Sequence, residues 1–192
     1  MRLMEETILR EGKVLPGGIL KVGSFLNQQI DPTLLRAFGE EVARLYAECG
    51  VTKIMTIEAS GIALAASAAL AMNVPMVFAK KHKTSNVDGS FYSTEVFSFT
   101  HQITNQILIS QDYLRADDVV VLVDDFLARG EALRGLVELT HQAGATLAGA
   151  AIAIEKSFQG GGDALRARGV RIESMAIIES MSDDSLVFRR QP

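Results

Sequence analysis

Two adjacent carboxylates, Asp124 and Asp125, follow the apolar run Val119–Val123, in which four of five residues are β-branched valines. Such a run is typical of a strand buried on both faces. Neighbouring like charges resist joint ionisation unless a cationic or hydroxyl-rich group is bound beside them. The pair therefore indicates a binding site at the end of this strand. The alternative is that both acids only cap the helix that follows.

The loop beyond the acids suits an anion. Gly130 allows backbone amides to turn toward an anion at the start of a helix expected over 131–143. Acids that bind hydroxyls and amides that bind phosphate together describe a site for a sugar phosphate. A phosphoacceptor receiver domain also has acids at a strand end, but it needs a second acidic cluster after the first strand. Here the strand expected over 52–57 is followed by Glu-Ala-Ser-Gly (58–61), with one carboxylate.

The apolar spacing alternates between strand-like and helix-like windows along the chain. Asp31 followed by Pro32 predicts a helix start, since Asp caps the free N–H groups and Pro needs none. Strands are expected over 52–57, 74–78, 119–123, 146–154 and 171–178, helices over 2–12, 32–46, 62–72, 131–143 and 163–168, and a hairpin over 91–110, turning near 100–102. This alternation predicts an α/β fold with a parallel sheet and helices on both faces.

Composition restricts the class of protein. The 192 residues carry a net charge of −4, which argues against nucleic-acid binding, and the length suits one domain. The longest apolar-rich runs, near 62–72 and 145–154, are too short to cross a membrane, and the N-terminus does not resemble a signal peptide. A cytoplasmic protein without membrane or nucleic-acid partners is expected. Cys49 is the single cysteine, and the three histidines show no metal-binding spacing.

The segment 121–132, Val-Leu-Val-Asp-Asp-Phe-Leu-Ala-Arg-Gly-Glu-Ala, resembles the phosphoribosyl diphosphate signature of type I phosphoribosyltransferases. Further matching segments occur in the expected order over 20–22, 24–32, 56–63, 77–83 and 154–158. The resemblance covers nearly the whole chain and implies one phosphoribosyltransferase domain over 1–192. In such a domain, residues 1–31 contribute to a hood over the base, and residues 80–112 form a flexible loop and a mobile hairpin.

The resemblance also implies an activity in purine salvage. Xanthine and 5-phospho-α-D-ribose 1-diphosphate (PRPP) would give xanthosine 5′-monophosphate and pyrophosphate. Asp124 and Asp125 would be catalytic, holding the ribose hydroxyls and stabilising the oxocarbenium-like centre. The PRPP-binding residues would be Ala128, Arg129, Gly130, Glu131 and Ala132, and the pyrophosphate loop would be Ala59, Ser60 and Gly61. Mg²⁺ would be bound mainly through the diphosphate, with no metal ligand directly from the protein.

For the base, the resemblance points to Leu20, Asn27 and Lys156. The lysine would donate to the exocyclic oxygen of a 6-oxopurine, and because lysine only donates, adenine would be rejected. Three further lysines, Lys80, Lys81 and Lys83, would stabilise the leaving group, in the same subunit or in the neighbouring subunit of an expected homodimer.

Two departures from the family pattern bear on these expectations. Arg129 and Ala132 stand where many relatives carry threonines, and Ala128 stands where the hypoxanthine–guanine branch carries a third acid. The absent acid fits xanthine, which is the more acidic purine and can bind already deprotonated. The alternatives are the same reaction on guanine or hypoxanthine, or a non-catalytic purine-sensing regulator of the same fold. About thirty residues precede the first core helix, too few for the winged helix of such a regulator.

Overall fold

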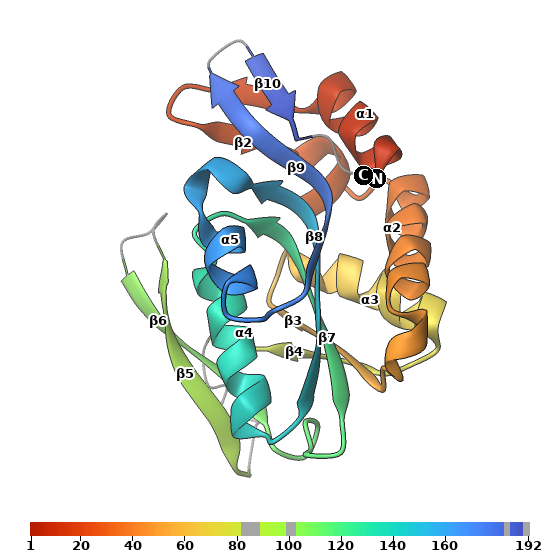
Figure 1. The fold of residues 1–192 in the computed structure, drawn as a ribbon, viewed down its shortest axis with the longest axis vertical. Coiled ribbons are helices and arrows are strands. Elements are labelled where there is room, and N and C mark those ends of the chain that lie inside the picture. Colours follow the sequence, from red (N-terminus) through yellow and green to blue (C-terminus); the bar gives the residue numbers. More distant parts are fainter. Residues whose placement is uncertain (82–88, 99–102, 183–184, 190–192) are drawn as a thin grey trace.

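The computed structural model describes residues 1–81, 89–98, 103–182 and 185–189. A six-stranded sheet with the strand order β10-β9-β8-β7-β3-β4 forms its centre (Figure 1). Its strands are β3 (Lys53–Ile57), β4 (Met76–Ala79), β7 (Val119–Leu127), β8 (Thr146–Lys156), β9 (Ile172–Ser182) and β10 (Ser185–Phe188). All neighbouring pairs are parallel except β9 and β10. The expected α/β fold is confirmed, and the antiparallel edge strand β10 is an addition that the sequence analysis did not foresee.

Helices cover both faces of the sheet (Figure 1). Helices α2 (Pro32–Leu45) and α3 (Gly61–Met72) lie on one face, and α4 (Glu131–Gln142) and α5 (Gly161–Arg166) lie on the other. Val121 and Val123 of β7 pack into the core under α2 and α3, whereas Val120 and Leu122 pack into the core under α4. The apolar run is continuous because successive side chains of a strand enter opposite layers.

The start of α2 confirms the capping prediction. The Asp31 carboxylate accepts hydrogen bonds from the backbone N–H groups of Thr33 and Leu34, at 2.8 and 3.0 Å, and Pro32 is the first helical residue. Helix α2 lies so close against α3 that a Cβ on Gly39 would stand 2.4 Å from Ser67 Oγ. Glycine at position 39 therefore permits this packing. These two helices form one layer, which packs on the face of the sheet that carries Val121 and Val123.

The N-terminal segment, called the hood below (residues 1–31), contains more structure than expected. After α1 (Arg2–Glu11) come the short antiparallel strands β1 (Lys13–Leu15) and β2 (Ile19–Lys21), then one π-helical turn, Gly23–Asn27. Only the first helix had been predicted. Helix α1 packs near β9, and the Met1 amino group donates to the carbonyl of Met175. The hood is thereby joined to β9.

The predicted hairpin is present as β5 (Phe91–Ser98) and β6 (Ile103–Ser110), while its predicted turn at 100–102 lies outside the described residues. We expected this hairpin to be mobile. In the structure its inner face is buried against α4, where a Cβ on Gly135 would meet Val96 and Ile107 side-chain atoms at 2.5 and 2.8 Å. A backbone bridge between Lys80 and Leu108 also connects the hairpin to the end of β4.

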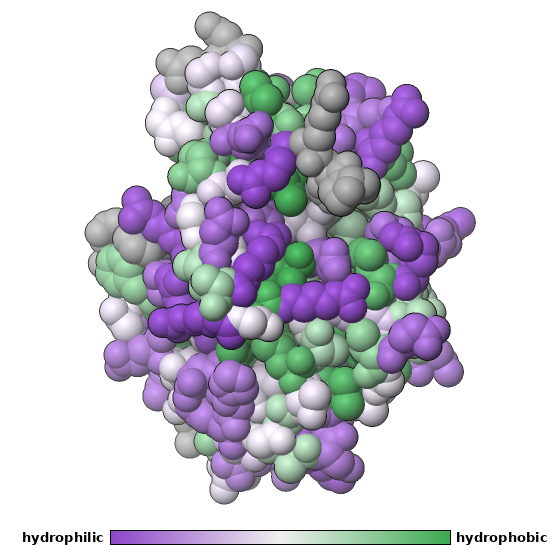
Figure 2. Space-filling view, viewed as in Figure 1, coloured by the Kyte–Doolittle hydropathy of each residue, from purple (hydrophilic) through white to green (hydrophobic). Residues whose placement is uncertain are grey.

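Hydrophilic side chains cover much of the face shown in Figure 2, with hydrophobic patches between them. Among the described residues, no helix is both long enough and apolar enough to cross a membrane. Two short 3₁₀ turns, Ala47–Cys49 and Ser157–Gln159, complete the elements.

The strand order identifies the crevice in which a ligand is expected to bind. From β3 the chain crosses through α3 to β4 on one side, whereas β7, β8 and β9 follow one another on the other side. The direction of winding therefore reverses between β3 and β7. In open α/β sheets, ligands bind outside the carboxyl ends of the strands at such a switch point.

Candidate active site

Asp124 and Asp125 lie at the switch point, inside β7 rather than after it. The strand that we expected to end at Val123 continues to Leu127, because Phe126 and Leu127 pair with Ile154 and Glu155 of β8. Neither acid caps α4, whose N-cap is Gly130 with no side-chain hydrogen bond. The capping alternative is therefore wrong.

The two carboxyl groups are almost completely buried, at 5% and 8% exposure. Asp124 Oδ1 accepts a hydrogen bond from the backbone N–H of Asp125 at 2.9 Å, and Asp125 Oδ1 accepts one from Phe126 at 3.0 Å. Burial raises the pKa of Asp124 well above its ordinary value, and the neighbouring charge of Asp125 raises it further, while Lys81 opposes both effects. A bound cationic group would favour the ionised form.

The hood reaches the site through two hydrogen bonds. Asn27 Nδ2 donates to Asp125 Oδ2 at 3.1 Å, and Lys156 Nζ donates to the carbonyl of Gly18 at 2.9 Å. Lys156 also lies over the ring of Phe126, 5.4 Å from its centroid, and burial lowers the pKa of its amine. Two of the three residues predicted to contact the base thus lie with the acids at one end of the sheet. The third, Leu20, belongs to β2 of the hood, and its side chain is buried in the hydrophobic core.

The predicted phosphate loop, residues 128–132, is fixed by hydrogen bonds from neighbouring segments. Gly130 has φ +84, a left-handed conformation that glycine adopts without strain. The carbonyl of Ala128 accepts from Gly161 N–H at 3.1 Å, and the carbonyl of Arg129 accepts from Arg134 Nη2 at 3.0 Å. Glu131, which would repel a phosphate if it faced one, is paired with Arg134.

The start of α5 forms a wall behind this loop. A Cβ on Gly161 would stand 2.4 Å from the carbonyl oxygen of Ala128, so only glycine fits there. Glu155, with 0% exposure, holds α5 in place: both its oxygens accept from Arg166, each at 2.7 Å, and it also accepts from Ser174. The bidentate Arg166 contact lowers the pKa of Glu155 despite its burial.

The sequence analysis missed Glu155 and Arg166. A single acid at the end of the apolar run 147–154 was the available signal, because a buried charge requires a partner. Nothing local identified Arg166, which lies eleven residues further along the chain.

The predicted pyrophosphate loop, residues 59–61, connects β3 to α3 beside Asp124. Its first peptide bond, Glu58–Ala59, is cis. A Glu58 oxygen accepts from the backbone N–H of Lys81 at 2.7 Å, so the end of β4 is tied to this loop. Lys81 is exposed, Lys80 is half-buried, and Lys83 lies outside the described residues.

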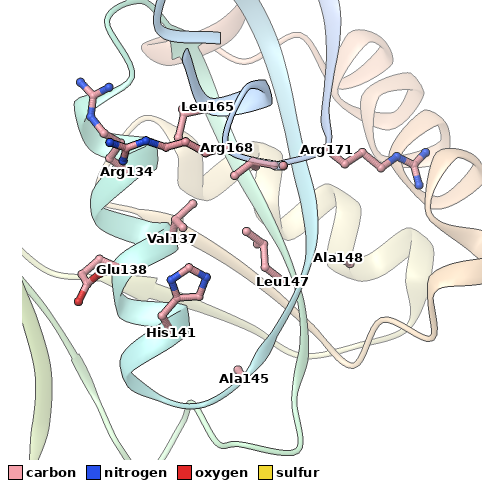
Figure 3. A pocket seen from close by; sticks show the side chains of 12 residues that line it. Arg134, Val137, Glu138, His141, Ala145, Leu147, Ala148, Leu165, Arg168 and Arg171 are labelled. Atoms are coloured by element: carbon pink, nitrogen blue, oxygen red, sulfur yellow. The ribbon is translucent and has the colours of Figure 1, made fainter. Parts of the chain in front are cut away.

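No group of three or more His, Cys, Asp or Glu side chains within the described ranges is arranged to hold a metal ion. A separate hollow of about 460 Å³ lies between α4, α5 and β8 and is lined by neither Asp124 nor Asp125 (Figure 3). Arg134 and Arg168 lie together at one end of it, whereas the Arg171 side chain points away from them. Arg134 thus lines this hollow and also donates to the carbonyl of Arg129 in the predicted phosphate loop.

Comparison with known proteins identifies the class. The chain belongs to the family described as "Phosphoribosyl transferase domain", whose model matches residues 32–181. It is 52% identical over 188 residues to a protein of Heliobacterium modesticaldum named xanthine phosphoribosyltransferase, covering 98% of this chain and 100% of that one. A protein of the same name from Limosilactobacillus reuteri is 49% identical, with 98% of each chain covered.

A solved structure confirms the fold. The adenine phosphoribosyltransferase of Rhodothermus marinus superposes with a TM-score of 0.75, covering 93% of this chain and 100% of that one. At 21% identity this likeness shows the fold alone.

Proposed function

We propose that this chain transfers the 5-phosphoribosyl group of PRPP to xanthine, giving xanthosine 5′-monophosphate and pyrophosphate. The observation that carries the proposal is the position of Asp124, Asp125 and Lys156 at the carboxyl ends of adjacent strands β7 and β8. The near-full-length similarity to proteins named xanthine phosphoribosyltransferase supports the choice of base.

The acids provide charge for the transition state. As the bond between C1 and the diphosphate breaks, positive charge develops on the ribose, and a fixed carboxylate nearby stabilises it. We assign this role to Asp124 and Asp125, with the ribose 2′ and 3′ hydroxyls as their hydrogen-bond donors. Asn27, which now donates to Asp125, is free to turn toward the base when those hydroxyls arrive.

The two loops would bind the two ends of PRPP. Residues 128–132 would bind the 5′-phosphate through backbone N–H groups, and residues 59–61 the pyrophosphate. Arg129 stands where relatives carry threonines, and it is exposed at the rim of the loop. We propose that it supplies a charge-assisted contact there. Lys80 and Lys81, with Lys83, are assigned to the leaving diphosphate, in one subunit or across a homodimer.

The residues present fit a magnesium ion that is bound mainly by substrate oxygens. Two carboxylates are the hard oxygen ligands that Mg²⁺ prefers, but no third acidic or histidine side chain joins them in the described chain. When bound, Mg²⁺ would neutralise charge on the diphosphate. Asp124 and Asp125 would face it from the ribose side.

Base selection rests on Lys156. Its amine now donates to the carbonyl of Gly18 and would exchange this acceptor for the exocyclic oxygen of an oxopurine. Adenine offers an amino group at that position, which leaves the lysine unpaired, and a buried unpaired donor is costly.

A panel of four bases tests the proposal. Steady-state rates with PRPP and Mg²⁺ are expected to give the highest kcat/KM for xanthine, then guanine or hypoxanthine, and the lowest for adenine. Lys156→Met should reduce the preference for xanthine over adenine by at least about tenfold. Lys13→Met, which removes an exposed lysine of β1, should leave the preference unchanged. Fastest turnover with adenine would overturn the assignment of Lys156.

A further inference from the structure

One buried hydroxyl group beside the site has no partner. Thr56 lies on β3 with 0% exposure, and in the described part of the chain its Oγ1 is the buried side-chain polar atom without a hydrogen bond. Buried polar groups are nearly always paired, because leaving one unpaired costs the full free energy of its desolvation. A hydroxyl in this position therefore requires an explanation.

The surroundings of Thr56 point to Asp124. Gly61, the first residue of α3, lies against both: a Cβ placed on it would stand 2.1 Å from Thr56 Oγ1 and 3.3 Å from Asp124 Oδ1. The hydroxyl and the carboxylate thus face the same small space under the pyrophosphate loop. Glycine at position 61 keeps that space open.

The chemistry of the two groups is complementary. An ionised carboxylate accepts hydrogen bonds and donates none, and a threonine hydroxyl can donate. A carboxylate that accepts from the ribose hydroxyls keeps oxygen lone pairs for a further donor.

We propose that Thr56 is a positioning residue whose hydroxyl donates to the carboxylate of Asp124 when PRPP is bound. This inference rests on the proposed function, since it takes Asp124 as the acid that faces the ribose. The hydroxyl is then unpaired in the free protein, which lowers the stability of the fold, and it forms its hydrogen bond only in the complex with PRPP.

Exchanging the hydroxyl for a methyl group tests this directly. Thr56→Val keeps the shape of the side chain and removes the unpaired polar atom. We expect the melting temperature of the ligand-free variant to rise by about 2 °C or more. In the same variant, kcat/KM for PRPP should fall by at least about tenfold, which corresponds to the loss of one charge-assisted hydrogen bond.

Two further variants separate positioning from packing. Thr56→Ser keeps the hydroxyl and loses the methyl, so it should melt below wild type yet retain kcat/KM within about threefold. Thr140→Val makes the same exchange at an equally buried threonine, whose hydroxyl already donates to the carbonyl of Leu136 at 2.8 Å. That control should melt lower and keep wild-type kcat/KM.

Several outcomes would overturn the inference: wild-type kcat/KM in Thr56→Val, a lower melting temperature in that variant, or loss of turnover in Thr56→Ser equal to that of Thr56→Val. Calorimetric titration of PRPP with Mg²⁺ keeps the test separate from the choice of base. If wild type binds PRPP but does not use xanthine, the proposed function fails. The role of Thr56 is still supported in that case if Thr56→Val binds PRPP more weakly while Thr56→Ser and Thr140→Val bind it like wild type.

Discussion

The two loops at the switch point are built in opposite ways. The loop at 128–132 after β7 is supported from behind by α5 and by Arg134, and its carbonyls are bonded to both. The loop at 59–61 after β3 lies over the unpaired hydroxyl of Thr56 and beside Asp124, a carboxyl group whose pKa is raised by burial. The first loop is hydrogen-bonded to its supports without ligand, whereas the second lies over a hydroxyl group that has no hydrogen-bond partner.

This difference matches the two groups that the loops are proposed to bind. The 5′-phosphate is the same in substrate and product, so a rigid, preformed cradle suits it. The diphosphate leaves during the reaction, and charge changes occur beside it. Interactions that strengthen only in the transition state raise the rate, whereas equal binding of both states does not. Four substitutions test the comparison, from the largest expected effect to the smallest.

Asp124→Asn should have the largest effect. Turnover with xanthine should fall by roughly 100-fold or more, because the carboxylate acts in the transition state. The raised folded pKa means that the stability contributed by protonated Asp124 is present at low pH and is lost as pH rises through that pKa. The amide stays neutral, so the variant should melt above wild type at pH 8, with a smaller difference at pH 5. Equal losses of melting temperature and turnover would contradict the comparison.

Gly161→Ala tests the preformed loop. The new Cβ would stand 2.4 Å from the carbonyl oxygen of Ala128, so the phosphate loop must shift. We expect KM for PRPP to rise by about tenfold while KM for xanthine changes little. Gly39→Ala is the matched control, because its Cβ would be equally crowded against Ser67 but far from either loop. It should lower stability and leave KM for PRPP unchanged; a similar rise in both variants would rule out a specific role for the wall.

Glu155→Gln tests the ion pair with Arg166 that holds α5 in place. Removing the charge of the buried Glu155 leaves Arg166 with Asp163, at 3.6 Å, as its ionic partner, and the free energy of unfolding at pH 7 should fall by about 3 kcal/mol. Because the folded pKa of Glu155 is lowered, its contribution is present above the unfolded pKa and is lost as pH falls through the folded value. Urea unfolding should therefore show the difference between wild type and variant shrinking below about pH 4. A difference independent of pH would contradict this account.

Arg134→Met should have the smallest effect. The methionine keeps the apolar stem but removes the donor to the carbonyl of Arg129. KM for PRPP should rise about two- to threefold, since partly exposed contacts of this kind contribute at most about 1 kcal/mol. Arg168→Met, from the same hollow, is the control and should leave KM at the wild-type value. An equal change in both would indicate a general effect of charge.

Much of the fold was predictable because its elements are encoded locally. The cap at Asp31 and the valine run of β7 follow from a few neighbouring residues, and both were confirmed. Strand ends were less predictable. Strand β7 continues to Leu127 because β8 offers it partners, and β10 forms only by pairing with β9. The hood hairpin was missed because its two strands have three residues each, too few for a visible period.

The sequence by itself determined the chemistry available at the site: adjacent acids after a valine-rich strand, a glycine-containing turn, and a lysine at the end of the next strand. Only the tertiary structure decided which groups meet. Lys156 donates to Gly18, 138 residues away, and Asn27 to Asp125, 98 residues away. Contacts at such separations, and the unpaired state of Thr56, depend on how the layers pack, which the spacing of residues along the chain does not record.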